Sequence, residues 1–146
     1  MGRPFKLEAV LKHRQYKEES ARKNFAEAVR ELKQQQGTLA AMRATYEQYC
    51  QALRVRQDSG GSANSILLYA RYLARLDSEI HAHQKIVATL ARDTESKRQA
   101  LMASLKDRKI IEKLKERHFF ELDREERQAE QKLLSDVAIS RHQHGK

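Results

Sequence analysis

Residues that interrupt helices are nearly absent from this sequence. Its 146 residues contain one proline, at position 4, and only five glycines. Proline inside a helix removes a backbone hydrogen bond and clashes with the preceding turn, but it is tolerated in a first turn, so Pro4 indicates a helix start. The one cluster of turn-forming residues is Asp58-Ser59-Gly60-Gly61-Ser62. We therefore expect two long helices, the second longer than the first, joined by a single turn.

Cysteine and long apolar runs are also scarce. Cys50 is the one cysteine, so the chain cannot form an internal disulfide, which fits the reducing cytoplasm. No apolar run reaches the roughly eighteen residues that a membrane-spanning helix needs, and the first residues lack the apolar core of a secretory signal. We therefore expect a soluble protein.

The composition is typical of long helices. Ala, Glu, Lys, Leu and Arg make up more than half of the chain, and the formal net charge is +9. The aliphatic residues are too few for a compact core. A seam between two helices needs only about two apolar residues in seven, so this composition favours a coiled coil.

Apolar residues recur every seven positions along both arms. In the first arm the two series begin at Pro4 and Leu7, and in the second arm they begin at Ile66 and Tyr69. After Leu101 the apolar spacing varies from three to five residues, so we expect the register to drift there. The residues of this looser set are Leu105, Ile111, Leu114, Phe119, Leu122, Ala129, Leu133 and Val137.

Folding the arms back at the glycine pair brings the two apolar series face to face. Facing residues then have numbers that sum to about 122, and nearly every layer pairs apolar with apolar. The expected pairs are Leu53 with Tyr69, Tyr46 with Leu76, Met42 with Ile80, Leu32 with Leu90, Ala21 with Leu101 and Leu11 with Ile111.

The predicted fold is all-α, a long two-helix antiparallel coiled-coil hairpin. We expect one domain over residues 1–146, with a first helix over 5–57, a turn over 58–65, a second helix over 65–139 and a frayed tail over 140–146. Gly37 falls inside the first helix, where we expect it to weaken the helix without ending it. The second helix is the longer one, so beyond about Lys115 it should lack a partner within the chain.

Patterns that carry catalysis or bind metals are missing. The sequence has no Gly-x-x-x-x-Gly-Lys-Ser/Thr loop, and its carboxylates alternate with Lys and Arg as helix surface pairs do, for example Glu18 with Arg22. His81 and His83 are two residues apart and point to different helix faces, so they are poor joint metal ligands. The prediction is a protein that is not an enzyme, with no cofactor and no metal.

Several segments resemble the flagellar FliJ family over nearly the whole chain. They are Pro4–Arg14, Tyr69–Leu76, Ile111–Arg117 and Glu130–Lys132. The resemblance implies a component of the bacterial flagellar type III export apparatus, similar to the central stalk of rotary ATPases. Its implied partners are the hexameric export ATPase, the cytoplasmic domain of the export gate and export chaperones. It also implies a cytoplasmic location, peripheral at the inner membrane beneath the flagellar basal body.

The resemblance and the antiparallel arrangement together predict a contact with the ATPase ring, because both terminal ends of the arms meet there. The predicted ring-contact residues are Phe5, Lys6, Leu7, Val10, Arg14, Arg117, Phe119, Phe120, Leu122, Arg124 and Gln131. Residues 97–117 carry eight basic and three acidic side chains, a charge of +5 that favours an acidic ring lumen.

Four of the five tyrosines gather near the turn, and a two-helix seam cannot bury all of them. Exposed aromatic residues beside aliphatic ones often mark an interface. The FliJ family presents a similar patch to the export gate. Carried onto this chain, the patch comprises Met42, Tyr49, Tyr72, Leu76 and His83.

Two other functions are compatible with a basic coiled coil. One is the related stalk of a needle-type secretion system. The other is a nucleic-acid-associated coiled coil, although the basic residues are interleaved with acidic ones and no aromatic stacking platform or DNA-binding motif accompanies them. We therefore expect no specific nucleic-acid partner.

Overall fold

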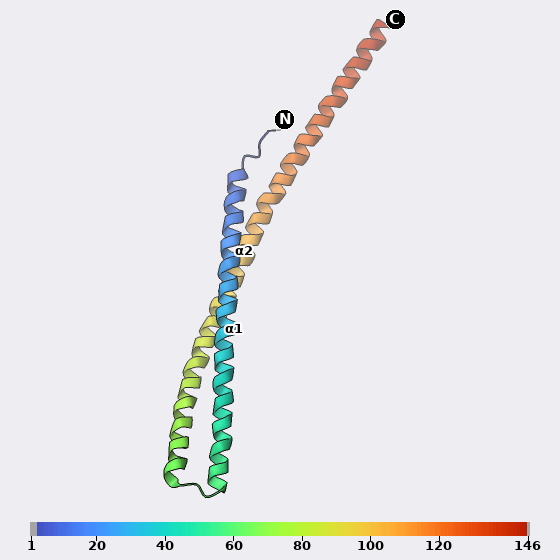
Figure 1. Ribbon diagram of the computed structural model, residues 1–146. Helices are drawn as coiled ribbons and strands as arrows, with labels where there is room; N and C mark the ends of the chain where they lie inside the picture. The colour runs from blue at the N-terminus through green and yellow to red at the C-terminus, as the bar shows by residue number, and fades with distance from the viewer. Residues whose placement is uncertain (1–2, 146) are drawn as a thin grey trace. The chain divides into compact units, whose positions relative to one another are not determined.

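Two helices account for nearly all of the residues that the computed structural model describes, 3–145. Helix α1 spans Glu8–Asp58 and helix α2 spans Ala63–His144, and the described residues include no strand (Figure 1). The predicted all-α fold with a longer second helix is confirmed. Gly2 and Lys146 lie outside the described range.

The helix boundaries follow from local capping. Glu8 places an acidic side chain in the first turn of α1, where it favours the positive end of the helix dipole. At the other end Gly60 adopts a φ of +73° and the amide of Gly61 donates to the carbonyl of Arg56, 2.8 Å away, which closes the helix. The hydroxyl of Ser62 accepts the amide of Ser65 at 3.2 Å and caps the start of α2.

The helix bounds differ from the expected ones at three points. Helix α1 begins three residues later than position 5, the turn between the helices is shorter than 58–65, and α2 continues to His144 instead of ending at 139. Residues 140–144 are helical because no proline or glycine lies between Gly61 and Gly145, and the basic side chains of the last turn complement the helix dipole.

The packing divides the chain into two units, and both helices contribute to each. The first unit comprises Met1–Ser20 and Met102–Lys146, and the second comprises Ala21–Leu101. The prediction of a single domain stays a prediction.

The second unit holds an apolar seam. Leu39, Leu76 and Ile80 form its buried cluster, and Met42 and Tyr46 pack against this cluster. Met42 and Tyr46 of α1 thus pack against a cluster that contains Leu76 and Ile80 of α2, and the individual predicted pairs stay predictions.

Two polar residues also occupy the seam of the second unit. The Thr94 hydroxyl is buried and donates to the carbonyl of Leu90 at 2.7 Å. The ring of His83 donates from Nε2 to the Gln35 carbonyl at 3.1 Å, since a carbonyl can only accept. These polar groups reach backbone acceptors, so they sit in the seam at little cost.

In the first unit α2 keeps its seven-residue register, contrary to the expected drift. The buried or half-buried positions continue the earlier series through Arg108, Ile111, Lys115, His118 and Leu122. The apolar pattern changes there because polar side chains occupy seam positions, while Leu114 and Phe119 lie to the side and are 39% and 49% exposed. The spacing of apolar residues alone did not reveal this register, because some seam positions are polar.

Ion pairs align the two helices in the first unit. Arg14 donates to Asp107 at 2.9 Å, and Lys115 lies 2.9 Å from Glu8. Glu18, predicted as a surface residue, is only 7% exposed and pairs with Arg108. That prediction was wrong because position 18 belongs to the first seam series and faces α2.

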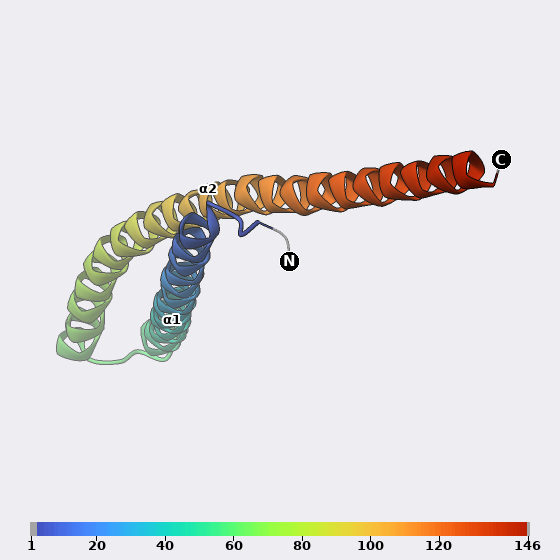
Figure 2. The same ribbon diagram turned by 90° about the horizontal axis from the view of Figure 1, so that it is seen from above.

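The residues of α2 after Leu122 make a bare helix. Every described residue from 123 to 145 is exposed, and both views show this end of α2 without a neighbour (Figures 1 and 2). We call residues 123–144 the tail. The partnered part of α2 extends to His118 and Leu122, somewhat beyond the expected limit at Lys115. Over the described residues, neither helix contains a stretch that is both long and apolar enough to cross a membrane.

Candidate functional site

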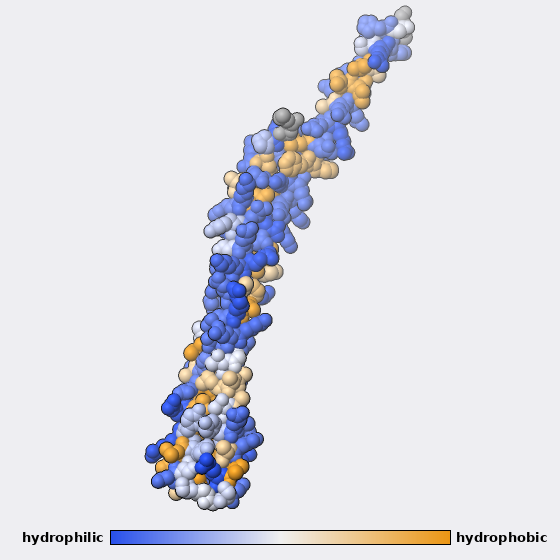
Figure 3. Space-filling model, viewed as in Figure 1, coloured by the Kyte–Doolittle hydropathy of each residue, from blue (hydrophilic) through white to orange (hydrophobic). Residues whose placement is uncertain are grey.

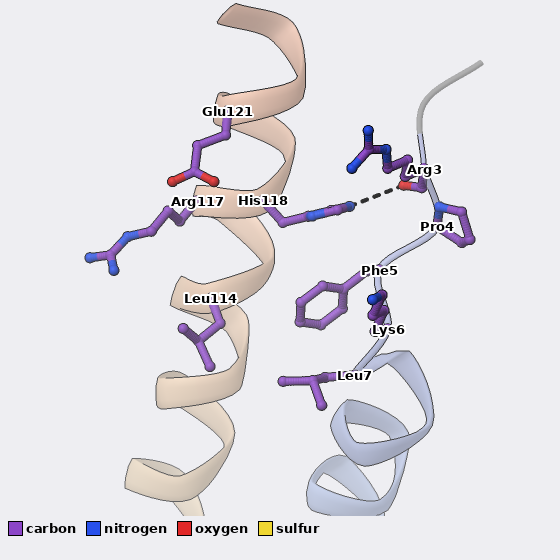
Figure 4. Close-up of a pocket in the computed structure, with 9 residues that line it drawn as sticks. All are labelled: Arg3, Pro4, Phe5, Lys6, Leu7, Leu114, Arg117, His118 and Glu121. Atoms are coloured by element: carbon purple, nitrogen blue, oxygen red, sulfur yellow. Dashed lines mark hydrogen bonds between the residues drawn. The ribbon is translucent and has the colours of Figure 1, made fainter. Parts of the chain in front are cut away.

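The N-terminal segment before α1 and the facing turns of α2 form an open groove. Its floor is apolar, with Phe5 and Leu7 directed toward Leu114 (Figure 4). The groove is lined by Arg3, Pro4, Phe5, Lys6, Leu7, Leu114, Arg117, His118 and Glu121. Four of the predicted ring-contact residues, Phe5, Lys6, Leu7 and Arg117, therefore lie together.

His118 holds the N-terminal segment in place. Its Nε2 donates to the carbonyl oxygen of Arg3 at 3.0 Å, as the dashed line in Figure 4 marks. Its ring also packs against the ring of Phe5, with 5.7 Å between centroids. The sequence analysis did not single out His118. His118 is a later member of the seven-residue series that begins at Tyr69 and passes through Ser104, so continuing that series would have found it.

The remaining predicted ring-contact residues are spread along the first unit. Val10 and Phe119 are partly exposed, and Phe119 lines a second shallow groove with Leu11 and Lys115. Phe120 is 67% exposed, so both adjacent phenylalanines are accessible. Arg14 forms its ion pair with Asp107, and Leu122 is half-buried. Arg124 and Gln131 are exposed on the tail.

A charged cluster lies beside this surface and fixes it. Arg108 donates to Glu112 at 2.6 Å and also pairs with Glu18. The hydrogen bonds to Glu112 and to Glu18 raise the pKa of Arg108 above its ordinary value. The cluster keeps the cation permanently charged within the seam.

Four of the predicted gate-contact residues, Met42, Tyr49, Tyr72 and Leu76, are linked by packing in the second unit, whereas half-buried His83 bonds to the Gln35 carbonyl. Tyr49 is 36% exposed, and its ring packs against Tyr72 with 4.6 Å between centroids. Met42 and Tyr72 are half-buried against the apolar cluster, and Leu76 is only 6% exposed inside it. A partner can thus reach the tyrosines directly, whereas Leu76 supports them from beneath.

A cation adds to this aromatic neighbourhood. The guanidinium of Arg56 lies 4.6 Å from the centre of the Tyr69 ring and donates to the Ser65 hydroxyl at 2.8 Å. Tyr69 in turn packs against Tyr49. Near this patch the pKa of Tyr46 is raised, chiefly by its electrostatic interaction with Cys50.

The described residues include no group of His, Cys, Asp and Glu side chains that could hold a metal ion. His81 donates from Nδ1 to the carbonyl of Asp77 on its own helix, while His83 faces α1. Elsewhere on α2, the hydrogen bond from Arg98 lowers the pKa of Glu95, an ordinary surface ion pair.

Comparison with protein families finds a match over almost the whole chain. The family described as flagellar FliJ protein matches residues 3–146. No curated protein and no solved structure matches the sequence significantly. Because the family match spans almost the whole chain, this protein belongs to the flagellar FliJ family and is associated with flagellar protein export.

Proposed function

We propose that this protein is the central stalk of the flagellar export ATPase ring, and that it couples the ring to the export gate and escorts export chaperones. The observation that carries the proposal is the exposure of the tail. All of its described residues are exposed, and the chain belongs to the FliJ family. A stalk must offer a ring a helix that its own chain leaves uncovered. The flagellar family match favours this system over a needle-type one.

The proposed ring contact is the end of the first unit together with the tail. Its apolar members are the groove residues Phe5 and Leu7 and the exposed Phe119 and Phe120. Lys6 and Arg117 add positive charge at the groove, which steers this end toward acidic parts of a partner. Val10, Arg14, Leu122, Arg124 and Gln131 complete the proposed surface.

A truncation tests the stalk role. Ending the chain after Leu122 removes the tail. It keeps the hydrogen bond of His118 with the Arg3 carbonyl and the ion pair of Lys115 with Glu8. We expect the truncated protein to lose stimulation of ATP hydrolysis and of hexamer assembly by the export ATPase. A truncation that stimulates as well as the full chain would overturn the proposal.

The proposed gate contact is the patch formed by Met42, Tyr49, Tyr72 and His83 over the buried Leu76. The exposed edges of the two tyrosines carry the direct contact, because aromatic side chains supply much of the binding energy of protein interfaces. Replacing both tyrosines by alanine should weaken binding to the cytoplasmic domain of the gate by at least about tenfold.

Tyr16 provides the matched control for the gate test. It is 70% exposed and lies in the first unit, outside the patch, so Tyr16→Ala should leave gate binding unchanged. Stimulation of the ATPase should survive the double tyrosine substitution. Equal loss of both activities would assign the tyrosines to folding instead of to the gate.

A further inference from the structure

An apolar stripe begins at Leu122 and runs into the tail, on the same face of α2 that forms the seam with α1. The stripe consists of Leu122, Ala129, Leu133 and Val137, at spacings of seven, four and four residues, which place them on one side of a helix. Leu133 is 64% exposed and Val137 is 41% exposed. We call these four residues the tail stripe. Figure 3 shows an apolar patch, in orange, on the otherwise hydrophilic surface of this part of the chain.

The tail stripe continues an interface that the chain itself has already built. From Arg108 to Leu122 the same face of α2 packs against the N-terminal part of α1 and its preceding segment. After Leu122 the face goes on, but α1 does not extend there. The surface is therefore shaped for another helix in the place that α1 occupies lower down.

Charge distinguishes the tail from the rest of this basic protein. Residues 121–136 carry six acidic and three basic side chains, a net charge of −3. Glu126 and Glu130 lie beside the tail stripe, at helical spacings of three or four from its members. Arg127, one of the three basic residues, is paired with Asp123 at 3.1 Å. A partner helix on this face therefore meets carboxylates.

Two tails packed in parallel do not complement each other on this surface. Two parallel tails would place Glu126 and Glu130 opposite their own equivalents, where like charges repel. Nucleic acid is excluded by the same negative charge, because its phosphates would face these carboxylates. Only a partner that brings cations satisfies both the stripe and its glutamates.

We propose that the tail stripe docks an amphipathic helix of a partner protein, with an apolar seam flanked by Lys or Arg that pair with Glu126 and Glu130. This deepens the stalk proposal by giving the chemistry of the tail's partner, but it rests on the tail's own surface and does not require the partner to be the ATPase. It also reverses the simple expectation from the net charge, under which partners of this protein would be acidic throughout.

Two synthetic peptides test the inference on the full-length protein. Both are three heptads long with leucine at the seam positions, and they differ only in having lysine or glutamate at the flanking positions. Binding is followed by fluorescence anisotropy of the labelled peptide. We expect the lysine peptide to bind at least about tenfold more tightly, since two favourable ion pairs replace two repulsive ones. The net charge of +9 alone would favour the glutamate peptide.

Variants place the binding on the tail. The double substitution Glu126→Lys and Glu130→Lys should reverse the preference between the peptides, whereas Leu133→Ala with Val137→Ala should weaken both. The control is Glu27→Lys on an exposed part of α1, which should change neither. Equal binding of the two peptides by the unsubstituted protein, or a preference for the lysine peptide that survives Glu126→Lys with Glu130→Lys, would overturn the inference.

Self-association provides the remaining test, measured by sedimentation velocity. A dimer that disappears in the Leu133→Ala and Val137→Ala variant would assign the stripe to a second copy and overturn the proposal. Because none of these measurements includes the ATPase, they can fail while the stalk role stands. Conversely, the stalk role can fail in the truncation assay while the peptides still bind as expected.

Discussion

Single polar side chains in the seam determine how the helices align in the first unit. Glu18 occupies a seam position with Arg108, which also bonds to Glu112. Such pairs contribute less to stability than well-packed apolar residues, because the charges lose hydration, but removing Glu18 deprives the half-buried Arg108 of its partner on α1 and leaves it Glu112 of its own helix. The pair therefore selects one alignment of the helices and penalises others.

Glu18→Ala should destabilise the protein more than Arg14→Ala does. Arg14 and Asp107 form a largely solvated pair, and such pairs contribute at most about 1 kcal/mol. Replacing both Glu18 and Arg108 by leucine should restore or raise stability, because it fills the seam without charge. Urea denaturation followed by circular dichroism measures all three. If the double leucine variant were less stable than Glu18→Ala, the register argument would fail.

Each helix owes its length to the absence of breakers and its ends to particular glycine and serine residues. Gly37 lies within the continuous helix α1, and a Cβ placed there would have no atom within 4 Å. Gly60 lies in the turn with a positive φ, which side chains other than glycine adopt at a cost. The conformation at Gly60 therefore favours glycine, whereas the conformation and surroundings of Gly37 would accept a side chain.

Gly37→Ala should stabilise the protein by about 1 kcal/mol, because alanine is the better helix former and the site is open. Gly60→Ala should instead destabilise it by about 1 kcal/mol, through the cost of a left-handed conformation. Thermal unfolding of both variants against the parent checks the signs. A destabilising Gly37→Ala would show that this position must bend or approach a partner.

At the scale of the whole molecule, stability and availability for binding are divided along the chain. The buried side chains lie in the paired parts of the helices, and none of the described residues beyond Leu122 is buried. Helix in the tail depends on local propensity and on pairs such as Arg127 with Asp123, without support from tertiary packing. The part proposed to bind partners is thus the part with the least support.

Hydrogen exchange should resolve this division. Tail amides should exchange far faster than those near Leu39 and Ile80, because the tail opens without disturbing any packed side chain. Truncation after Leu122 should lower the total helical signal but leave the midpoint of thermal unfolding unchanged. A lower midpoint would mean that the tail supports the paired helices.

The sequence by itself determined the helices, the turn and the pairing of the arms in the second unit. Pro4 and the glycine pair are local signals, and seven-residue apolar repeats report a seam directly, so no tertiary information was needed for them. The exposure of at least one of Phe119 and Phe120 was also predictable, since neighbouring residues on a helix cannot both face one partner.

Only the tertiary structure decided the register after Leu101, the burial of Glu18 and the role of His118. These residues are polar, and a polar residue enters a seam only when a specific partner satisfies it: Arg108 for Glu18, and the Arg3 carbonyl for His118. Such partners lie about a hundred residues apart in the sequence. A pattern based on hydrophobicity therefore cannot register them, because the stabilising contact exists only once the chain has folded back.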